Sequence, residues 1–234
     1  MMFPRPLVRA ELVQRYKRFL SDHRLESGEI VTAHCANPGR MIGIKEPGMA
    51  TWLAPAGNLK RKLQWDWELV FADDTLIGCH TGRPNGLVEE AILDDTITEL
   101  SGYAALRREV KYGENSRIDM LLTDPDRPDC YVEVKYCHMR RETSLAEFPD
   151  SVTTRGAKHM AELANMVEAG HRSVLIYCIE RMDCDGFTTA DDIDPDYDAA
   201  LRDALARGVE AYAYSCRLTE QEISIDRRLP TILD

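Results

Sequence analysis

The stretch that decides the fold is RIDMLLTDPDRPDCYVEVK, residues 117–135. Two runs rich in apolar residues flank the turn-forming segment at residues 124–128, which predicts antiparallel strands over residues 117–123 and 130–136. A turn centred near Asp126 pairs residues whose numbers add up to 252, and it sets Asp119 directly across from Glu133. The hairpin therefore predicts two facing carboxylates.

Side chains alternate along a strand, so Lys135 is expected on the same face as Asp119 and Glu133. The opposite face would carry the apolar side chains Ile118, Met120, Val132 and Val134. Two opposed carboxylates destabilise a strand pair unless a cation neutralises them, and Mg²⁺ (or Mn²⁺) prefers such oxygen ligands. Lys135 could then orient or deprotonate a water and stabilise charge on a phosphate.

A second reading of the hairpin stays open, in which Lys135 and Arg117 simply pair the acids on a surface. The same tripeptide pattern occurs at Glu109-Val-Lys111. No acid faces that copy across a predicted hairpin, so it is interpreted as structural.

Outside this hairpin the pattern differs between the two parts of the chain. Turn signals about every ten residues in the first 80 residues predict short strands, and hence a small sandwich or barrel. Helices are expected over residues 87–93, 151–169 and 197–207, and strands over 106–112 and 173–180, with a last strand over 209–215. This alternation predicts an α/β domain with a mixed sheet over residues 81–234, after a first domain over residues 1–80.

Composition narrows the class of protein. The 234 residues carry 29 Lys and Arg against 40 Asp and Glu, a net charge of −11, and 44% are hydrophobic. The longest apolar run has six residues, which excludes a membrane span, and the first residues lack a secretory signal. Seven cysteines without a CxxC pair are interpreted as reduced thiols, so a cytoplasmic location is expected.

Residues 1–65 depart from this acidity, with 11 basic residues against five acidic ones. The candidates for contacts with nucleic-acid phosphates in this part are Arg15, Lys17, Arg18, Lys60, Arg61 and Lys62. Neighbouring aromatic residues could stack on bases, or could belong to the core. In the helix after Asp150, the candidates are Arg155, Lys158 and His159, for which an exposed polar helix face is the alternative.

The hairpin resembles the core of PD-(D/E)xK nucleases, and the whole chain resembles the sugar fermentation stimulation protein A (SfsA) family. The matching stretches are RYKRFL at 15–20, HCANPG at 34–39, KRK at 60–62, WEL at 67–69, EAI at 90–92, ELSGY at 99–103, EVKYG at 109–113, RID at 117–119, PDCYVEVK at 128–135, FPD at 148–150, RGAKH at 155–159 and GVE at 208–210.

The resemblance implies an OB-like N-terminal barrel followed by a restriction-endonuclease-like α/β domain. It also implies binding of nucleic acid, DNA rather than RNA, and hydrolysis of phosphodiester bonds with Mg²⁺ or Mn²⁺. Asp119, Glu133 and Lys135 match the nuclease triad, and Glu90 matches a further metal-binding carboxylate on a helix. The alternative is a nucleic-acid-binding regulator of sugar-metabolism genes that does not cleave. The assembly stays open, with a homodimer as one alternative.

The chain departs from the family pattern directly after the triad. It reads YCHM at residues 136–139, followed by a longer segment, RRET, at residues 140–143. The departure leaves the metal ligands unchanged and alters the side chains expected at the rim of the site.

Overall fold

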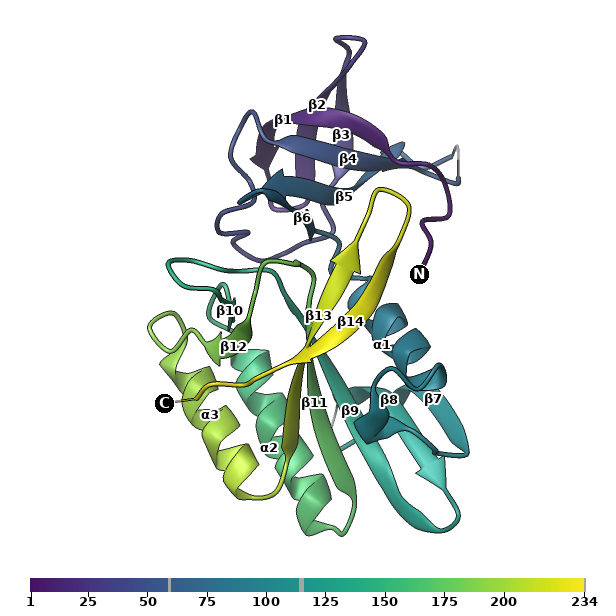
Figure 1. The fold of residues 1–234 in the computed structure, drawn as a ribbon, viewed down its shortest axis with the longest axis vertical. Coiled ribbons are helices and arrows are strands. Elements are labelled where there is room, and N and C mark those ends of the chain that lie inside the picture. Colours follow the sequence, from purple (N-terminus) through teal and green to yellow (C-terminus); the bar gives the residue numbers. More distant parts are fainter. Residues whose placement is uncertain (59, 114–115, 234) are drawn as a thin grey trace.

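The structure is a computed structural model that describes residues 1–58, 60–113 and 116–233. Its first part is a barrel built from β1 (Val8–Tyr16), β2 (Leu20–Leu25), β3 (Ile30–His34), β4 (Ala50–Pro55), β5 (Trp65–Ala72) and β6 (Thr75–Gly78). The strands follow the order β3-β2-β1-β4-β5-β6, and a pairing between His34 and Asp66 joins β3 to β5. Five strands therefore close on themselves, and β6 extends β5 outside the ring (Figure 1). The predicted barrel is confirmed.

The second part is an α/β domain below the barrel in Figure 1. Its elements are α1 (Pro84–Leu93), β7 (Ala105–Tyr112), β8 (Ser116–Asp124), β9 (Arg127–Cys137), β10 (Leu145–Phe148), α2 (Thr154–Glu168), β11 (Arg172–Ile179), β12 (Gly186–Thr189), α3 (Pro195–Ala206), β13 (Glu210–Leu218) and β14 (Ile223–Leu229), with a short 3₁₀ helix at Thr98–Leu100. The main sheet has the order β14-β13-β11-β9-β8-β7 and contains both parallel and antiparallel pairs. The predicted mixed sheet is confirmed.

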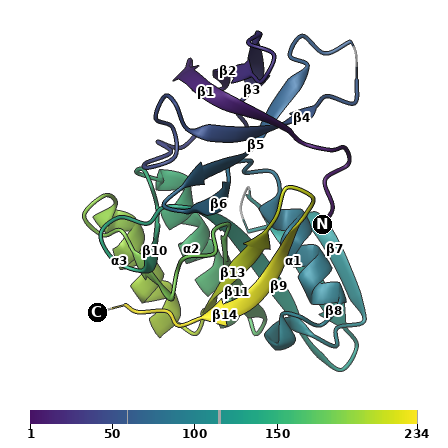
Figure 2. The same cartoon turned by 45° about the horizontal axis from the view of Figure 1, so that its top comes forward.

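The helices cover the two faces of this sheet. Leu87 and Val88 of α1 pack on one face together with Met120 and Val132. On the other face, α2 and α3 pack their buried side chains against β11. Figure 2 shows the same separation from a second angle. A helix on each side buries the apolar side chains of both sheet faces, which is the usual reason that central strands are apolar throughout.

Local signals explain where the helices begin and end. The Thr153 side chain accepts a hydrogen bond from the Gly156 amide at 3.1 Å, and Asp194 caps α3 in the same way through Tyr197. Gly170, with φ +92°, follows α2, and it adopts a left-handed conformation that suits glycine.

Three details differ from the sequence-based expectation. The strand at residues 209–215 is not the last, because β14 follows it and forms the edge of the sheet. The pair β10–β12 was not expected either. Ile118 packs with Leu121 on the α2 side and not with Met120, so the alternation predicted for β8 is interrupted at Asp119.

Buried polar contacts join the two domains. The Arg181 side chain, 2% exposed, donates to the His138 carbonyl at 2.8 Å and to Asp73 of the barrel at 2.9 Å. Residues at the start of the chain also lie on the second domain, since the Phe3 amide donates to the Gln221 carbonyl at 2.9 Å. The segment 1–80 therefore packs partly with the second domain.

A buried acidic pair lies at the same junction. Glu68 of β5 is 2% exposed and pairs with Arg83, which precedes α1. Both carboxylate oxygens of Glu180, after β11, have no hydrogen-bond partner among the described residues. Burial, and then the charge of Glu68, raises the pKa of Glu180 to about 8, against the opposing effect of Arg83. Glu180 is therefore protonated at neutral pH.

Replacing Glu180 with glutamine is expected to change the pH dependence of stability. The folded-state pKa of about 8 lies above the usual value of 4.5. The folded chain therefore holds a proton that the unfolded chain releases. The contribution of this proton to the stability of the folded state is complete below pH 4.5 and is lost as pH rises through 8. In urea unfolding, the wild type should lose about 1 kcal/mol per pH unit relative to Glu180→Gln across this window. The control is Glu222→Gln at the surface, for which the free energy of unfolding should change with pH as it does in the wild type. The same parallel behaviour in Glu180→Gln would contradict this prediction.

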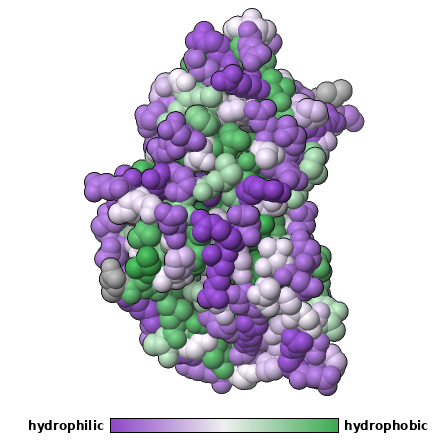
Figure 3. Space-filling model, viewed as in Figure 1, coloured by the Kyte–Doolittle hydropathy of each residue, from purple (hydrophilic) through white to green (hydrophobic). Residues whose placement is uncertain are grey.

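The surface is polar overall. Figure 3 shows hydrophilic side chains over both domains on this face, with hydrophobic ones in patches between them. None of the helices formed by the described residues has the length and apolar character needed to cross a bilayer. All seven cysteines are free and buried, two in the barrel and five in the second domain.

Candidate active site

Strands β8 and β9 pair in the predicted register beyond the turn, whereas the pair Asp124–Arg127 beside the turn adds up to 251, with a register shift between Leu122 and Asp124. The pairs Met120–Val132, Leu121–Tyr131 and Leu122–Cys130 all have residue numbers that add up to 252. The pairing ends before Asp119, whose Oδ2 accepts a hydrogen bond from the Val134 amide at 2.8 Å. The Asp119 carboxylate thus takes up a backbone donor of the neighbouring strand, and it stays beside Glu133.

Asp119 and Glu133 affect each other electrostatically. Burial, and then the negative charge of Glu133, raises the pKa of Asp119 above its usual range. Hydrogen bonds from the Val134 amide and from the Asn85 side chain, at 2.8 Å, oppose that shift. Two carboxylates in this arrangement favour the binding of a proton or a cation.

Glu133 is the better neutralised of the two. Its side chain is 5% exposed, and burial alone would raise its pKa, but the charge of Lys135 and a hydrogen bond from His159 lower it below the usual range. Lys135 Nζ lies 2.6 Å from Glu133 Oε1. The second oxygen, Oε2, is buried without a hydrogen-bond partner among the described residues.

Helix α2 contributes a chain of donors to Glu133. Arg155 Nε donates to His159 Nε2 at 3.2 Å, and His159 Nδ1 bonds to Glu133 Oε1. Because arginine only donates, Nε2 is the acceptor nitrogen, and the ring proton lies on Nδ1 facing Glu133. The structure therefore brings Arg155 and His159 to the triad, while Lys158 is exposed and lies 3.5 Å from Glu162.

Two further side chains, one carboxylate and one amide, were not identified from the sequence. Glu162, one turn after His159, is buried, and neither of its carboxylate oxygens has a hydrogen-bond partner among the described residues. Its spacing of three residues from His159 on α2 was the available signal. Asn85, at the start of α1, contacts Asp119, and no pattern in the sequence indicated it.

Glu90 lies elsewhere on α1. Its carboxylate is half-exposed and forms an ion pair with the amino group of Met1 at 2.7 Å. Asn85 is the residue of this helix that contacts Asp119, because positions 85 and 90 lie on different sides of an α-helix. The structure therefore does not bring Glu90 to the carboxylate pair.

The donor set suits a hard divalent cation with few protein ligands. Within residues 1–58, 60–113 and 116–233, no group of three or more His, Cys, Asp and Glu side chains is spaced to hold a metal ion. Mg²⁺ is usually held by one or two carboxylates and several waters, so it does not need such a group. The unpartnered Glu133 Oε2 and the raised pKa of Asp119 fit a cation shared by these two residues.

The barrel candidates fall into two groups. Arg15 donates to the carbonyls of Asn37 and Gly39, at 2.8 and 3.0 Å, and Arg61 is paired with Asp66 at 2.6 Å, so both stabilise the barrel's own loops. Exposed side chains form the second group: Lys17, Arg18, Lys60 and Lys62. Among the nearby aromatic residues, Phe19 is 45% exposed, whereas Trp67 is buried in the barrel core.

The fold defines a class of protein in which an OB-like barrel is joined to a restriction-endonuclease-like α/β domain. Comparisons with known families agree, since residues 13–79 match a family model described as "SfsA N-terminal OB domain". Residues 82–222 match one described as "Sugar fermentation stimulation protein RE domain". The chain belongs to the sugar fermentation stimulation protein (SfsA) family.

Individual relatives are similar over nearly their whole length. A sugar fermentation stimulation protein homolog from Rhodospirillum centenum is 58% identical over 98% of both chains. The homolog from Maricaulis maris is 55% identical over 97% of both. Among solved structures, SfsA from Pyrococcus furiosus is 25% identical with a TM-score of 0.89, and the match covers 99% of this chain and 98% of that one. The arrangement of the two domains is therefore shared with that protein.

Proposed function

We propose that this protein binds DNA and hydrolyses its phosphodiester bonds with a Mg²⁺ or Mn²⁺ ion held by Asp119 and Glu133. The observation that carries the proposal is the pair of adjacent carboxylates on β8 and β9, with the Lys135 ammonium 2.6 Å from one of them. SfsA from Pyrococcus furiosus was solved in complex with Ca²⁺, which supports a cation site in the family.

Each side chain has a defined part in this proposal. A bound divalent ion polarises a phosphate and lowers the pKa of an attacking water. Lys135 would position that water and stabilise negative charge on the phosphate. His159 would hold the Glu133 carboxylate through Nδ1, and Arg155 would fix the imidazole tautomer. The exposed Lys17, Arg18, Lys60 and Lys62 of the barrel would contact backbone phosphates.

One observation favours a second function, the binding of nucleic acid without cleavage. Lys135 and His159 both bond to Glu133 Oε1, so part of the charge is neutralised by the protein itself. In that case the chain would bind a strand as a regulator, and the carboxylates would be structural.

A single experiment separates the two functions. Single- and double-stranded DNA and RNA are incubated with the protein in Mg²⁺, Mn²⁺, Ca²⁺ or EDTA, and both cleavage and the salt dependence of binding are measured. The proposal expects cleavage in Mg²⁺ or Mn²⁺ and none in EDTA, together with an affinity that falls steeply with salt. Binding with no cleavage under any condition would select the second function, and binding that salt leaves unchanged would contradict both.

A further inference from the structure

A cavity of about 390 Å³ lies between the barrel and the second domain, next to the carboxylate pair. Its walls include Arg18 and the loop at residues 37–39 from the barrel, and the end of β9 and the segment before α2 from the second domain. Lys135 also lines it. Sites for small molecules usually have volumes of about 300–1,000 Å³, so this cavity can hold one ring-containing ligand.

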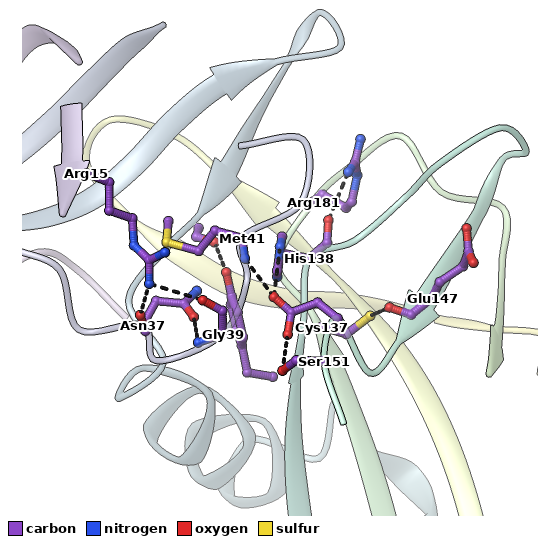
Figure 4. A network of polar contacts seen from close by, with 12 residues as sticks. Arg15, Asn37, Gly39, Met41, Cys137, His138, Glu147, Ser151 and Arg181 are labelled. Carbon is purple, nitrogen blue, oxygen red and sulfur yellow. Dashed lines mark hydrogen bonds and ion pairs between the residues drawn. The ribbon is translucent and has the colours of Figure 1, made fainter. Parts of the chain in front are cut away.

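The barrel wall of the cavity is held in place by hydrogen bonds that Figure 4 shows from close by. Arg15 binds the carbonyls of Asn37 and Gly39, and the Met41 amide donates to Asp150 Oδ2 at 2.8 Å. A Cβ at position 39 would lie 2.6 Å from that same oxygen. Glycine at this position therefore allows the barrel loop to approach Asp150.

A buried histidine with an unpartnered nitrogen lies in the wall of the cavity. The His138 side chain is 3% exposed and stacks on Tyr136, with ring centroids 5.3 Å apart. Its Nε2 has no hydrogen-bond partner among the described residues, since Asp150 Oδ2 lies 3.9 Å away. An unpaired buried polar atom is destabilising, by about 1–3 kcal/mol in proteins generally, so a ligand that bonds to it would remove this cost. Burial lowers the pKa of His138 to about 4, and the ring is neutral at pH 7.

Asp150 adds acceptors to the same wall. Its Oδ2 accepts from Met41 and its Oδ1 from the Ser151 hydroxyl at 3.1 Å, which leaves further lone pairs for a ligand. Nucleobases carry N–H donors on the edge used in base pairing, and enzymes that take in an unstacked base read it by hydrogen bonds to that edge and by stacking. Tyr136, His138 and Asp150 all line the cavity, so its wall contains both aromatic rings and polar side chains.

Two positively charged side chains in the cavity wall could contact the phosphate of such a nucleotide. Arg18, at the turn between β1 and β2, and Lys135 both line the cavity. Because Lys135 bonds to Glu133, a phosphate near its Nζ is also close to the carboxylate pair. A paired base in a duplex is stacked and its edge is occupied, so only an unpaired nucleotide could enter.

We propose that this cavity binds one unpaired nucleotide of a strand, with its base against His138 and Asp150 and its phosphate toward Lys135. The inference rests on the nucleic-acid-binding part of the function proposed above. It names unpaired or flipped-out nucleotides as the substrate class, and it assigns His138 and Asp150 to binding.

The test is the binding of the four deoxynucleoside 5′-monophosphates to the full chain in EDTA, measured by saturation-transfer NMR and calorimetry. At least one nucleotide should bind, with saturation of its base protons. His138→Phe should weaken its affinity about tenfold, the effect of losing one hydrogen bond. Phenylalanine keeps the ring stacked on Tyr136 and removes an unpaired buried nitrogen, so the melting temperature should not fall.

Asp150→Asn is the second variant and decides the question if His138→Phe does not fold. It keeps an acceptor for the Met41 amide and removes the charge that attracts base donors, so a similar loss is expected. Lys111→Ala serves as the control with unchanged affinity. Equal affinities of both variants and the wild type would overturn the proposal, as would full competition by inorganic phosphate without saturation of base protons.

The outcome is separable from that of the cleavage experiment, because the assay contains no metal and needs no hydrolysis. Cleavage of DNA without any nucleotide binding would overturn the cavity proposal alone. Nucleotide binding that depends on His138, without cleavage in any metal, would overturn the hydrolytic function and leave the cavity proposal standing.

Discussion

Glu133→Gln is expected to lower Mg²⁺-dependent cleavage of DNA by about 10³-fold, a loss typical of removing one electrostatic group that stabilises a transition state. Glutamine keeps the shape of the side chain and removes the negative charge that would hold the cation. It also keeps an oxygen that can accept hydrogen bonds from Lys135 and His159, although it removes the charge that pairs with Lys135, so folding is measured separately from cleavage. Initial rates on single-stranded DNA, with circular dichroism as a check of folding, provide the measurement.

A matched control for this prediction exists in the chain itself. Glu109-Val-Lys111 repeats the Glu133-Val-Lys135 tripeptide, but Lys111 is exposed on β7. Lys135→Ala should therefore lower cleavage strongly, and Lys111→Ala should leave it unchanged. Wild-type rates in Glu133→Gln or equal losses in both lysine variants would rule out the assigned triad.

Arg83→Met is expected to lower the free energy of unfolding by about 3 kcal/mol or more at neutral pH. The change leaves the Glu68 carboxylate, 2% exposed, without its bidentate partner and close to Glu180. Removing one member of a buried ion pair is far more costly than the pair itself is stabilising, because the remaining charge stays desolvated. Urea unfolding followed by fluorescence measures the difference.

The control for Arg83→Met is Arg217→Met, which breaks a surface pair with Glu222 in which the Arg217 side chain is 63% exposed. Such pairs contribute about 0–1 kcal/mol, so little change is expected. A similar small effect in Arg83→Met would mean that the junction relaxes and admits water around Glu68.

The carboxylate hairpin could be predicted because its determinants are local. The turn between β8 and β9 and the apolar pattern of the two strands bring Met120 opposite Val132, so Asp119 and Glu133, the next residues along, lie close together without long-range information. The helix ends could also be predicted, since glycine and turn residues mark them along the chain, whereas the turn pattern of the first part left a sandwich or a barrel open.

The rest of the site depends on packing between segments that are distant in sequence. Whether Glu90 or Asn85 faces Asp119 depends on the rotation of α1 about its axis, which its apolar residues alone do not determine to within one side chain. Glu162 is buried only because α2 packs on β11, a strand that follows it in the chain. The cavity wall at Asp150 requires the barrel loop at Gly39, which is more than one hundred residues away in the sequence.

Because all seven thiols are buried, the reactivity of the cysteines reports local unfolding of this chain. Cys35 and Cys79 lie in the barrel, and Cys130, Cys137, Cys178, Cys184 and Cys216 lie in the second domain. An alkylating reagent can reach these sulfur atoms only through transient exposure, so the rate at which each one is modified measures local unfolding. Mass spectrometry of the modified peptides would thus follow the loosening of either half separately, with no label engineered into the protein.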